Sequence, residues 1–170
     1  MAEFEEDFVQ VRQRAFAPLN SPRQLLVACA PMRSAVNLGR IARMAGCCAV
    51  ERLIVCGSGR IDPKIARDAL GTLRIEERRS LAPVLERLRE EGWMVVGLEQ
   101  ADHSVNIHEF AFPKRTALVV GNERTGLLPD ELRLLHHVVE IPVWGAPAAY
   151  NAATAATIGM YEYCRQHPTG

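Results

Sequence analysis

The chain has 170 residues, of which 48% are hydrophobic and 24% are charged. This is the composition of an ordinary globular protein, and the length suits one domain with one sizeable core. Lysine plus arginine equals aspartate plus glutamate at 20 each, so the formal net charge is zero. Any nucleic-acid partner must therefore bind a local basic patch rather than a uniformly basic surface.

Membrane, secreted and metal-binding classes are disfavoured by the pattern of residues. No apolar run approaches the ~18 residues needed to span a bilayer, and the acidic start MAEFEEDF lacks the features of a signal peptide. The five cysteines contain no CxxC pair, so we expect neither a metal site nor a disulfide framework. The expectation is a cytoplasmic protein with no membrane partner and no metal.

The first twenty residues predict an N-terminal helical extension, ahead of a main domain over residues 21–170. Apolar residues recur there at helical spacing: Phe4, Phe8, Val11 and Ala15. Such a face usually covers a core or a subunit surface, so we interpret it as a packing element.

A strand–helix–strand unit is predicted next. Residues 25–30 (LLVACA) form a continuous apolar run that is typical of a strand buried on both faces. After a loop, residues 36–47 have helical spacing, with Asn37 as a candidate N-cap. Residues 53–56 form the next buried run, which completes a βαβ unit.

The remaining elements continue this alternation. Residues 81–91 predict an amphipathic helix, and residues 93–98 (WMVVGL) predict a third buried strand. Two further runs, 117–120 and 138–141, stop at glycine or proline, and a helix of small residues is predicted over 150–166. Five apolar runs interleaved with helices predict an α/β fold with a mainly parallel sheet flanked by helices.

Glycines and polar residues gather after the last two predicted strands. Open α/β sheets bind ligands just past the carboxyl ends of their strands, so the site is expected there. No loop carries the GxGxxG fingerprint of a dinucleotide-binding domain, although a nucleotide-binding α/β protein of another class stays an alternative. The residues concerned are Gly121, Asn122, Glu123, Gly126, Pro142 and Asn151.

Three short motifs resemble those of the SpoU/TrmH-type RNA 2′-O-ribose methyltransferases of the SPOUT superfamily. NLGRIAR, at 37–43, is similar to the first motif, in which an asparagine, a glycine and a catalytic arginine recur at this spacing. GNERTGL, at 121–127, looks like the second motif. IPVWGAPAAYNAATAA, at 141–156, is similar to the third, in which Ile-Pro precedes a Ser-Leu-Asn triplet. The motifs stand in family order, as in the minimal single-domain members.

The resemblance implies a SPOUT-type fold with a C-terminal trefoil knot, and a homodimer that modifies tRNA or rRNA. It implies S-adenosylmethionine as the cofactor, with S-adenosylhomocysteine as the product. By matching position, the cofactor-binding residues are Leu98, Gly121, Asn122, Gly126, Ile141, Pro142, Tyr150 and Asn151.

The resemblance also implies the catalytic set Arg43, Asn37, Glu123 and Asn151. A guanidinium stays protonated in proteins, so we expect Arg43 to stabilise the developing alkoxide or to position a phosphate rather than act as a base. Asn37 and Glu123 are expected to hold it, Glu123 through a bidentate pair. Arg33 and Arg40, beside the first motif, are predicted RNA phosphate contacts.

One triplet departs from the family pattern. Ala149, Tyr150 and Asn151 stand where the family has Ser-Leu-Asn, so the serine hydroxyl is absent. Loss of one hydrogen bond typically costs about 0.5–1.5 kcal/mol, which slows a reaction without abolishing it. Two functions therefore stay open: an RNA 2′-O-ribose methyltransferase, and a catalytically weakened SPOUT protein that acts as an RNA-binding module.

Overall fold

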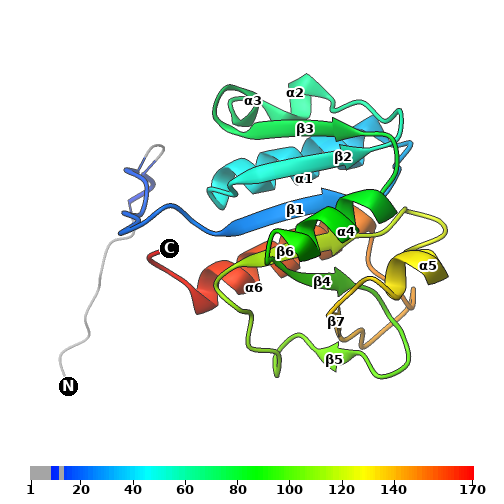
Figure 1. Ribbon diagram of the computed structural model, residues 1–170. Coiled ribbons are helices and arrows are strands. Elements are labelled where there is room, and N and C mark those ends of the chain that lie inside the picture. Colours follow the sequence, from blue (N-terminus) through cyan, green and yellow to red (C-terminus); the bar gives the residue numbers. More distant parts are fainter. Residues whose placement is uncertain (1–8, 12–13) are drawn as a thin grey trace, which may run out of the picture.

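The computed structural model describes residues 9–11 and 14–170, and a seven-stranded sheet forms its centre (Figure 1). Every strand pair in it is parallel, and the strand order is β3-β2-β1-β6-β4-β7-β5. The strands are β1 (Leu25–Cys29), β2 (Arg52–Cys56), β3 (Arg74–Arg78), β4 (Met94–Leu98), β5 (Val105–Asn106), β6 (Thr116–Val120) and β7 (His137–Glu140). The predicted α/β class with a mainly parallel sheet is confirmed.

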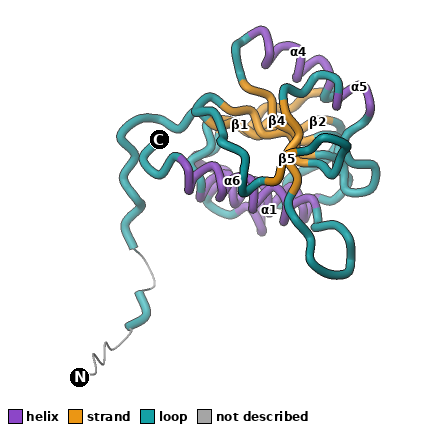
Figure 2. The backbone as a smooth tube through the Cα atoms, turned by 90° about the horizontal axis from the view of Figure 1, so that it is seen from below, coloured by secondary structure: helices purple, strands orange, loops and turns teal. Residues whose placement is uncertain are grey.

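Helices cover both faces of this sheet. Figure 2 shows α1 and α6 on one side of the strands and α4 and α5 on the other. The helices are α1 (Ala35–Cys47), α2 (Pro63–Ala66), α3 (Ala69–Thr72), α4 (Ala82–Glu90), α5 (Pro129–Leu132) and α6 (Ala152–Gln166). Within the same described residues, no helix has the length and apolar character that crossing a membrane requires.

The buried core explains the continuous apolar runs of the sequence. Strands β1, β2 and β6 are buried along their whole length, as expected for parallel strands covered on both faces. Alternate residues of β1 enter different clusters: Val27 packs with Leu38 of α1, whereas Leu26 packs with Leu85 of α4. One strand thus joins two helical layers, and its carboxyl end is held in a fixed position between them.

Two strands and one helix cap differ from the predictions. Strand β3 (RIEER) is polar and lies at the sheet edge, where the Glu76 carboxylate accepts from Arg52 at 2.8 Å and from Arg87 at 2.6 Å. Strand β5 is only two residues long, too short to leave a periodic pattern. The N-cap of α1 is Ser34 rather than Asn37, because the Ser34 hydroxyl accepts from the Asn37 N–H.

The predicted N-terminal helix falls partly on residues 1–8 and 12–13, which lie outside the described residues. Residues 9–11 and 14–20 carry no helix. The main domain begins with β1, and the division at residue 20 stays a prediction.

Because all the strands are parallel, their carboxyl ends meet at one edge of the sheet, which we call the carboxyl edge. The loops that leave it include residues 30–34 after β1, 57–62 after β2, 99–104 after β4, 121–128 after β6 and 141–151 after β7. The three sequence motifs all begin or end at this edge.

Candidate functional site

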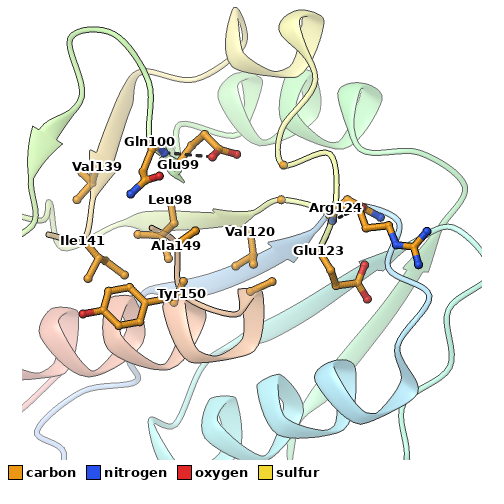
Figure 3. A pocket seen from close by; sticks show the side chains of 15 residues that line it. Leu98, Glu99, Gln100, Val120, Glu123, Arg124, Val139, Ile141, Ala149 and Tyr150 are labelled. Atoms are coloured by element: carbon orange, nitrogen blue, oxygen red, sulfur yellow. Dashed lines mark hydrogen bonds between the residues drawn. The ribbon is translucent and has the colours of Figure 1, made fainter. Parts of the chain in front are cut away.

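A central hollow opens at the carboxyl edge where β4, β6 and β7 end (Figure 3). Seven predicted site residues line it: Leu98, Gly121, Asn122, Glu123, Gly126, Ile141 and Tyr150. Eight other residues line it that were not among the predicted site residues: Glu99, Gln100, Val120, Arg124, Val139, Ala149, Ala152 and Ala155. Six of them lie within a predicted strand or motif, and only Glu99 and Gln100, which follow the strand predicted over 93–98, lie outside.

The loop after β6 forms one wall of the hollow and requires its glycines. Asn122 and Gly126 form an antiparallel bridge, in which each backbone N–H donates to the other residue's carbonyl at 3.0 Å. A Cβ on Gly121 would lie 2.6 Å from the backbone carbon of Gly126, and Gly126 itself has φ +63°. Because these two glycines carry no side chain, a ligand can approach the backbone of the loop closely.

Two residues that follow β4, Glu99 and Gln100, form hydrogen bonds to the loops on both sides of the hollow. The Glu99 carboxylate accepts from the N–H of Leu127 at 2.9 Å, and so it supports the loop after β6. The Gln100 side-chain amide donates to the carbonyl of Ala148 at 3.1 Å, and so it supports the loop after β7. Figure 3 shows both side chains beside Leu98.

Residues from all three motifs meet at the start of α1. The Glu123 carboxylate accepts from the Ser34 N–H at 2.9 Å, and the Asn151 amide donates to the Asn37 side-chain oxygen at 3.3 Å. Burial would raise the pKa of Glu123, but hydrogen bonds from the backbone of Ser34 and Arg33 and from the Asn37 side chain outweigh it and lower that pKa. Glu123 is therefore a fixed, ionised acceptor.

Asn151 has a second structural role as the N-cap of α6. Its side-chain oxygen accepts from the Ala153 N–H at 2.9 Å, while its nitrogen reaches Asn37. One side chain thus caps one helix and ties it to another. Asn151 stands beside the central hollow rather than in its lining.

The arginines of the first motif stand apart from this cluster. Arg43 and Arg40 are exposed on α1, and Arg33 is exposed in the loop before it. The bidentate pair expected between Glu123 and Arg43 is not among the ion pairs of the described residues, in which the Glu123 carboxylate accepts from the start of α1. Arg43 is left free to contact a bound molecule.

The triplet that departs from the family pattern adjoins the hollow. Ala149 and Tyr150 line it, and the Tyr150 hydroxyl donates to the carbonyl of Pro142 at 3.3 Å. That hydrogen bond joins the two ends of the loop after β7. The Tyr150 hydroxyl points away from the Glu123 end of the hollow (Figure 3). Pro142 lies in an adjoining hollow.

The lining suits a ligand with one flat apolar part and one polar part. Leu98, Val139 and Ile141 supply apolar side chains at one end, and Glu123 and Arg124 supply charges at the other (Figure 3). Among the described residues, no group of three or more His, Cys, Asp or Glu side chains is placed to hold a metal ion.

Comparison with known proteins gives a consistent result. Residues 24–161 match the SpoU rRNA Methylase family. The chain is 32% identical over 143 residues to the 23S rRNA (uridine(2479)-2′-O)-methyltransferase of Streptomyces viridochromogenes, a match that covers 79% of this chain and 50% of that protein. The chain thus spans about half the length of this curated relative.

Two solved structures show the same architecture. The TrmH/SpoU tRNA modifying enzyme of A. aeolicus superposes with a TM-score of 0.80 at 25% identity, over 86% of this chain and 76% of that one. The SpoU methyltransferase AviRb of Streptomyces viridochromogenes, solved in complex with AdoMet, superposes with a TM-score of 0.73 at 28% identity, over 91% and 64% of the two chains.

Proposed function

Because this chain belongs to the SpoU rRNA Methylase family, we propose that it transfers a methyl group from S-adenosylmethionine to a ribose 2′-hydroxyl of tRNA or rRNA. The observation that carries the proposal is the meeting of all three motifs beside one hollow, where Asn151 donates to Asn37 and the Glu123 carboxylate accepts from the N–H of Ser34 at the start of the same helix. Relatives named as 2′-O-methyltransferases of 23S rRNA and of tRNA support this substrate class.

S-adenosylmethionine would supply the electrophilic methyl group, and the central hollow fits it. An adenine needs apolar side chains, which Leu98 and Ile141 provide, and close approach to the backbone, which Gly121 and Gly126 permit. The polar tail would reach backbone groups around Asn122 or the start of α6. AviRb was solved with this cofactor bound.

Arg43 is the residue proposed to act on the substrate ribose. Its exposed guanidinium has no ion-pair partner among the described residues, so it can stabilise an oxygen that gains negative charge. Asn37, Glu123 and Asn151 would hold the start of α1 and the start of α6 in place around it. Arg33 and Arg40 would contact phosphates of the RNA.

A trefoil knot is proposed from the path of the chain. The pairing of β4 with β6 closes a chain loop over residues 94–120. The chain then lies on the α4 face as α5, continues as β7 between β4 and β5, and reaches the α1 face as α6. Passage of the chain from one face to the other through a closed loop supports the knot.

We also propose a cytoplasmic homodimer. The outer surfaces of α1 and α6 expose apolar groups, including Val36 and Tyr161, on two helices that pack together. Sedimentation of the purified chain tests the dimer.

Calorimetric titration with S-adenosylmethionine, followed by a methyl-transfer assay on unmodified RNA, tests the proposed function. We expect saturable binding of one cofactor per chain and transfer of its methyl group to RNA. No cofactor binding by a folded protein would reject the proposal. Binding of RNA without transfer would support the weakened alternative that Ala149 suggests.

A further inference from the structure

A second hollow adjoins the central one at the carboxyl edge. It lies between Gln100 and Glu140 on the sheet side and Val143, Gly145 and Ala148 on the loop after β7. Gln100 and Ile141 line both hollows, so a molecule bound in one lies next to a molecule bound in the other.

Trp144 stands in the loop of this second hollow, between two of its lining residues. Its side chain is 83% exposed, whereas the other tryptophan of the chain, Trp93, is 4% exposed. An indole in water leaves its large apolar face without a partner, and exposed aromatic rings of this kind are what RNA-binding proteins stack against unpaired bases.

The loop that carries Trp144 is held at its base. Gln100 donates to the carbonyl of Ala148 at 3.1 Å, and the Tyr150 hydroxyl donates to the carbonyl of Pro142 at 3.3 Å. The loop connects β7 to α6 and crosses the carboxyl edge (Figure 1). An indole ring on a loop held by such hydrogen bonds loses less conformational entropy when it stacks on a planar ligand than a ring on an unrestrained segment.

The polar groups of the second hollow suit a base rather than a phosphate. The Glu140 carboxylate is anchored by the Ser104 hydroxyl at 2.6 Å and would repel a phosphate, but it can accept from an exocyclic amino group. The side chain of Gln100, whose nitrogen holds the loop, offers a carbonyl oxygen as a further acceptor. The hollow therefore offers hydrogen-bond acceptors for the edge of a base, while Trp144, outside its lining but on the same loop, offers an exposed ring for the face of that base.

Charges along the same edge favour RNA as the partner. Arg33, Arg60 and Arg124 follow β1, β2 and β6, and all three are exposed. None of them forms an ion pair with a described residue. Guanidinium groups without acidic partners, spread along one edge, can bind successive phosphates of a strand whose base reaches Trp144.

We infer that the second hollow binds an unpaired base of the RNA substrate, stacked on Trp144 and placed beside the ribose that the central hollow serves. This inference rests on the proposed function, since it assigns one subsite to the RNA that is methylated. The ligand class is a nucleobase of a single-stranded or looped segment. A base locked in a duplex cannot reach this position.

Affinity for RNA of matched sequence tests the inference directly. Wild type, Trp144→Ala, Trp144→Phe and Leu70→Ala are titrated with a single-stranded 15-mer of mixed sequence and with its fully paired duplex. Leu70 is the control because it is a large apolar residue, 37% exposed, that lies on α3 and outside the site. We expect Trp144→Ala to bind the single strand about tenfold more weakly, Trp144→Phe to lose less, and Leu70→Ala to match wild type.

Fluorescence supplies a second readout on the folded full chain. Single-stranded RNA should quench the emission of wild type, and it should leave the remaining emission of Trp144→Phe unchanged, because Trp93 is buried. Equal affinity of wild type and Trp144→Ala for the single strand overturns the inference. So does a change in sedimentation caused by Trp144→Ala, which would assign the ring to a contact between two copies.

The two proposals can fail separately. If wild type binds S-adenosylmethionine and methylates RNA while Trp144→Ala does so with unchanged KM for RNA, only the stacking subsite is rejected. If wild type binds neither the cofactor nor RNA, the proposed function is rejected, and the subsite with it.

Discussion

The side-chain amide of Asn151 donates a hydrogen bond to the side-chain oxygen of Asn37 across 3.3 Å, although 114 residues separate them. This contact joins the start of α6 to α1, next to the Glu123 carboxylate that the start of α1 holds. The first and third sequence motifs are thus one structural unit, which the second motif completes.

Asn151→Ala should lower the free energy of unfolding by about 1 kcal/mol, because α6 loses its N-cap. Asn151→Asp should keep most of that stability, since an aspartate oxygen can still accept from Ala153 and a negative charge suits a helix N-terminus. It should still lose activity, because it has no nitrogen to donate to Asn37. Urea denaturation and methyl transfer, measured on both variants, separate the two roles. Equal stability of wild type and Asn151→Ala would contradict the capping role.

Arg43→Ala should reduce methyl transfer about 100-fold or more while it leaves the affinity for S-adenosylmethionine unchanged. The guanidinium is exposed and does not line the central hollow, so its loss removes charge stabilisation rather than a cofactor contact. Single-turnover experiments measure the rate of methyl transfer, and calorimetry measures the affinity for S-adenosylmethionine. Arg133→Ala is the matched control, because Arg133 is exposed on the opposite helical layer. Turnover like that of wild type in Arg43→Ala would reject the role.

Gly121→Ala should weaken cofactor binding tenfold or more. The new Cβ would lie 2.6 Å from the backbone of Gly126, and the bridge between Asn122 and Gly126 keeps the loop from opening. Calorimetry measures the loss. Gly71→Ala on α3 is the control, since a Cβ there has no atom within 4 Å. Unchanged affinity in Gly121→Ala would show that this loop does not form the cofactor wall.

Glu76→Gln should destabilise the domain by about 3 kcal/mol at neutral pH. The Glu76 side chain is 9% exposed and pairs with Arg52, Arg78 and Arg87. The change removes the buried negative charge that these three arginines share, and it leaves Arg52, whose side chain is 10% exposed, only the longer 3.6 Å pair with Glu91. The neighbouring variant Glu77→Gln, at an exposed position of the same strand, should stay within about 0.5 kcal/mol of wild type. Urea denaturation of the three proteins checks the difference.

The same ion pairs make stability depend on pH. Burial would raise the pKa of Glu76, but the hydrogen bonds from Arg87 and Arg52 outweigh it, and the pKa falls below its ordinary value of 4.5. A carboxyl with a lowered folded-state pKa contributes its full stability above that ordinary value, and the contribution is lost as the pH falls through the folded-state pKa. The difference between wild type and Glu76→Gln should therefore be constant from pH 7 to pH 5 and should shrink below pH 4.5. A difference that grew on acidification would contradict this account.

The continuous apolar runs were enough to predict the central strands and the α/β class, because parallel strands buried on both faces must be apolar throughout. Strand β3 escaped prediction because its sequence is polar, and the arginines that pair with its least exposed carboxylate, Arg52 and Arg87 on Glu76, lie outside RIEER. Long-range pairing of this kind does not leave a local pattern.

The residues of the candidate site were likewise predicted where a local motif marked them and missed where their role depends on a distant residue. Gly121, Asn122, Gly126 and Ile141 were found from motif residues and do line the hollow. Glu99 was missed because its role depends on Leu127, which lies 28 residues away. The bidentate pair expected between Glu123 and Arg43 is not among the ion pairs of the described residues, and the Glu123 carboxylate accepts from the N–H of Ser34.

Mass spectrometry of nucleosides detects the proposed methyl transfer itself. Unmodified tRNA and rRNA transcripts are incubated with the protein and with S-adenosylmethionine that carries a deuterated methyl group, then digested to nucleosides. We expect a 2′-O-methylnucleoside that carries the deuterated methyl group on its ribose in the wild-type reaction and not in the Arg43→Ala reaction. A label on a base, or no label on any RNA from a protein that binds the cofactor, would contradict the proposed 2′-O-methyl transfer.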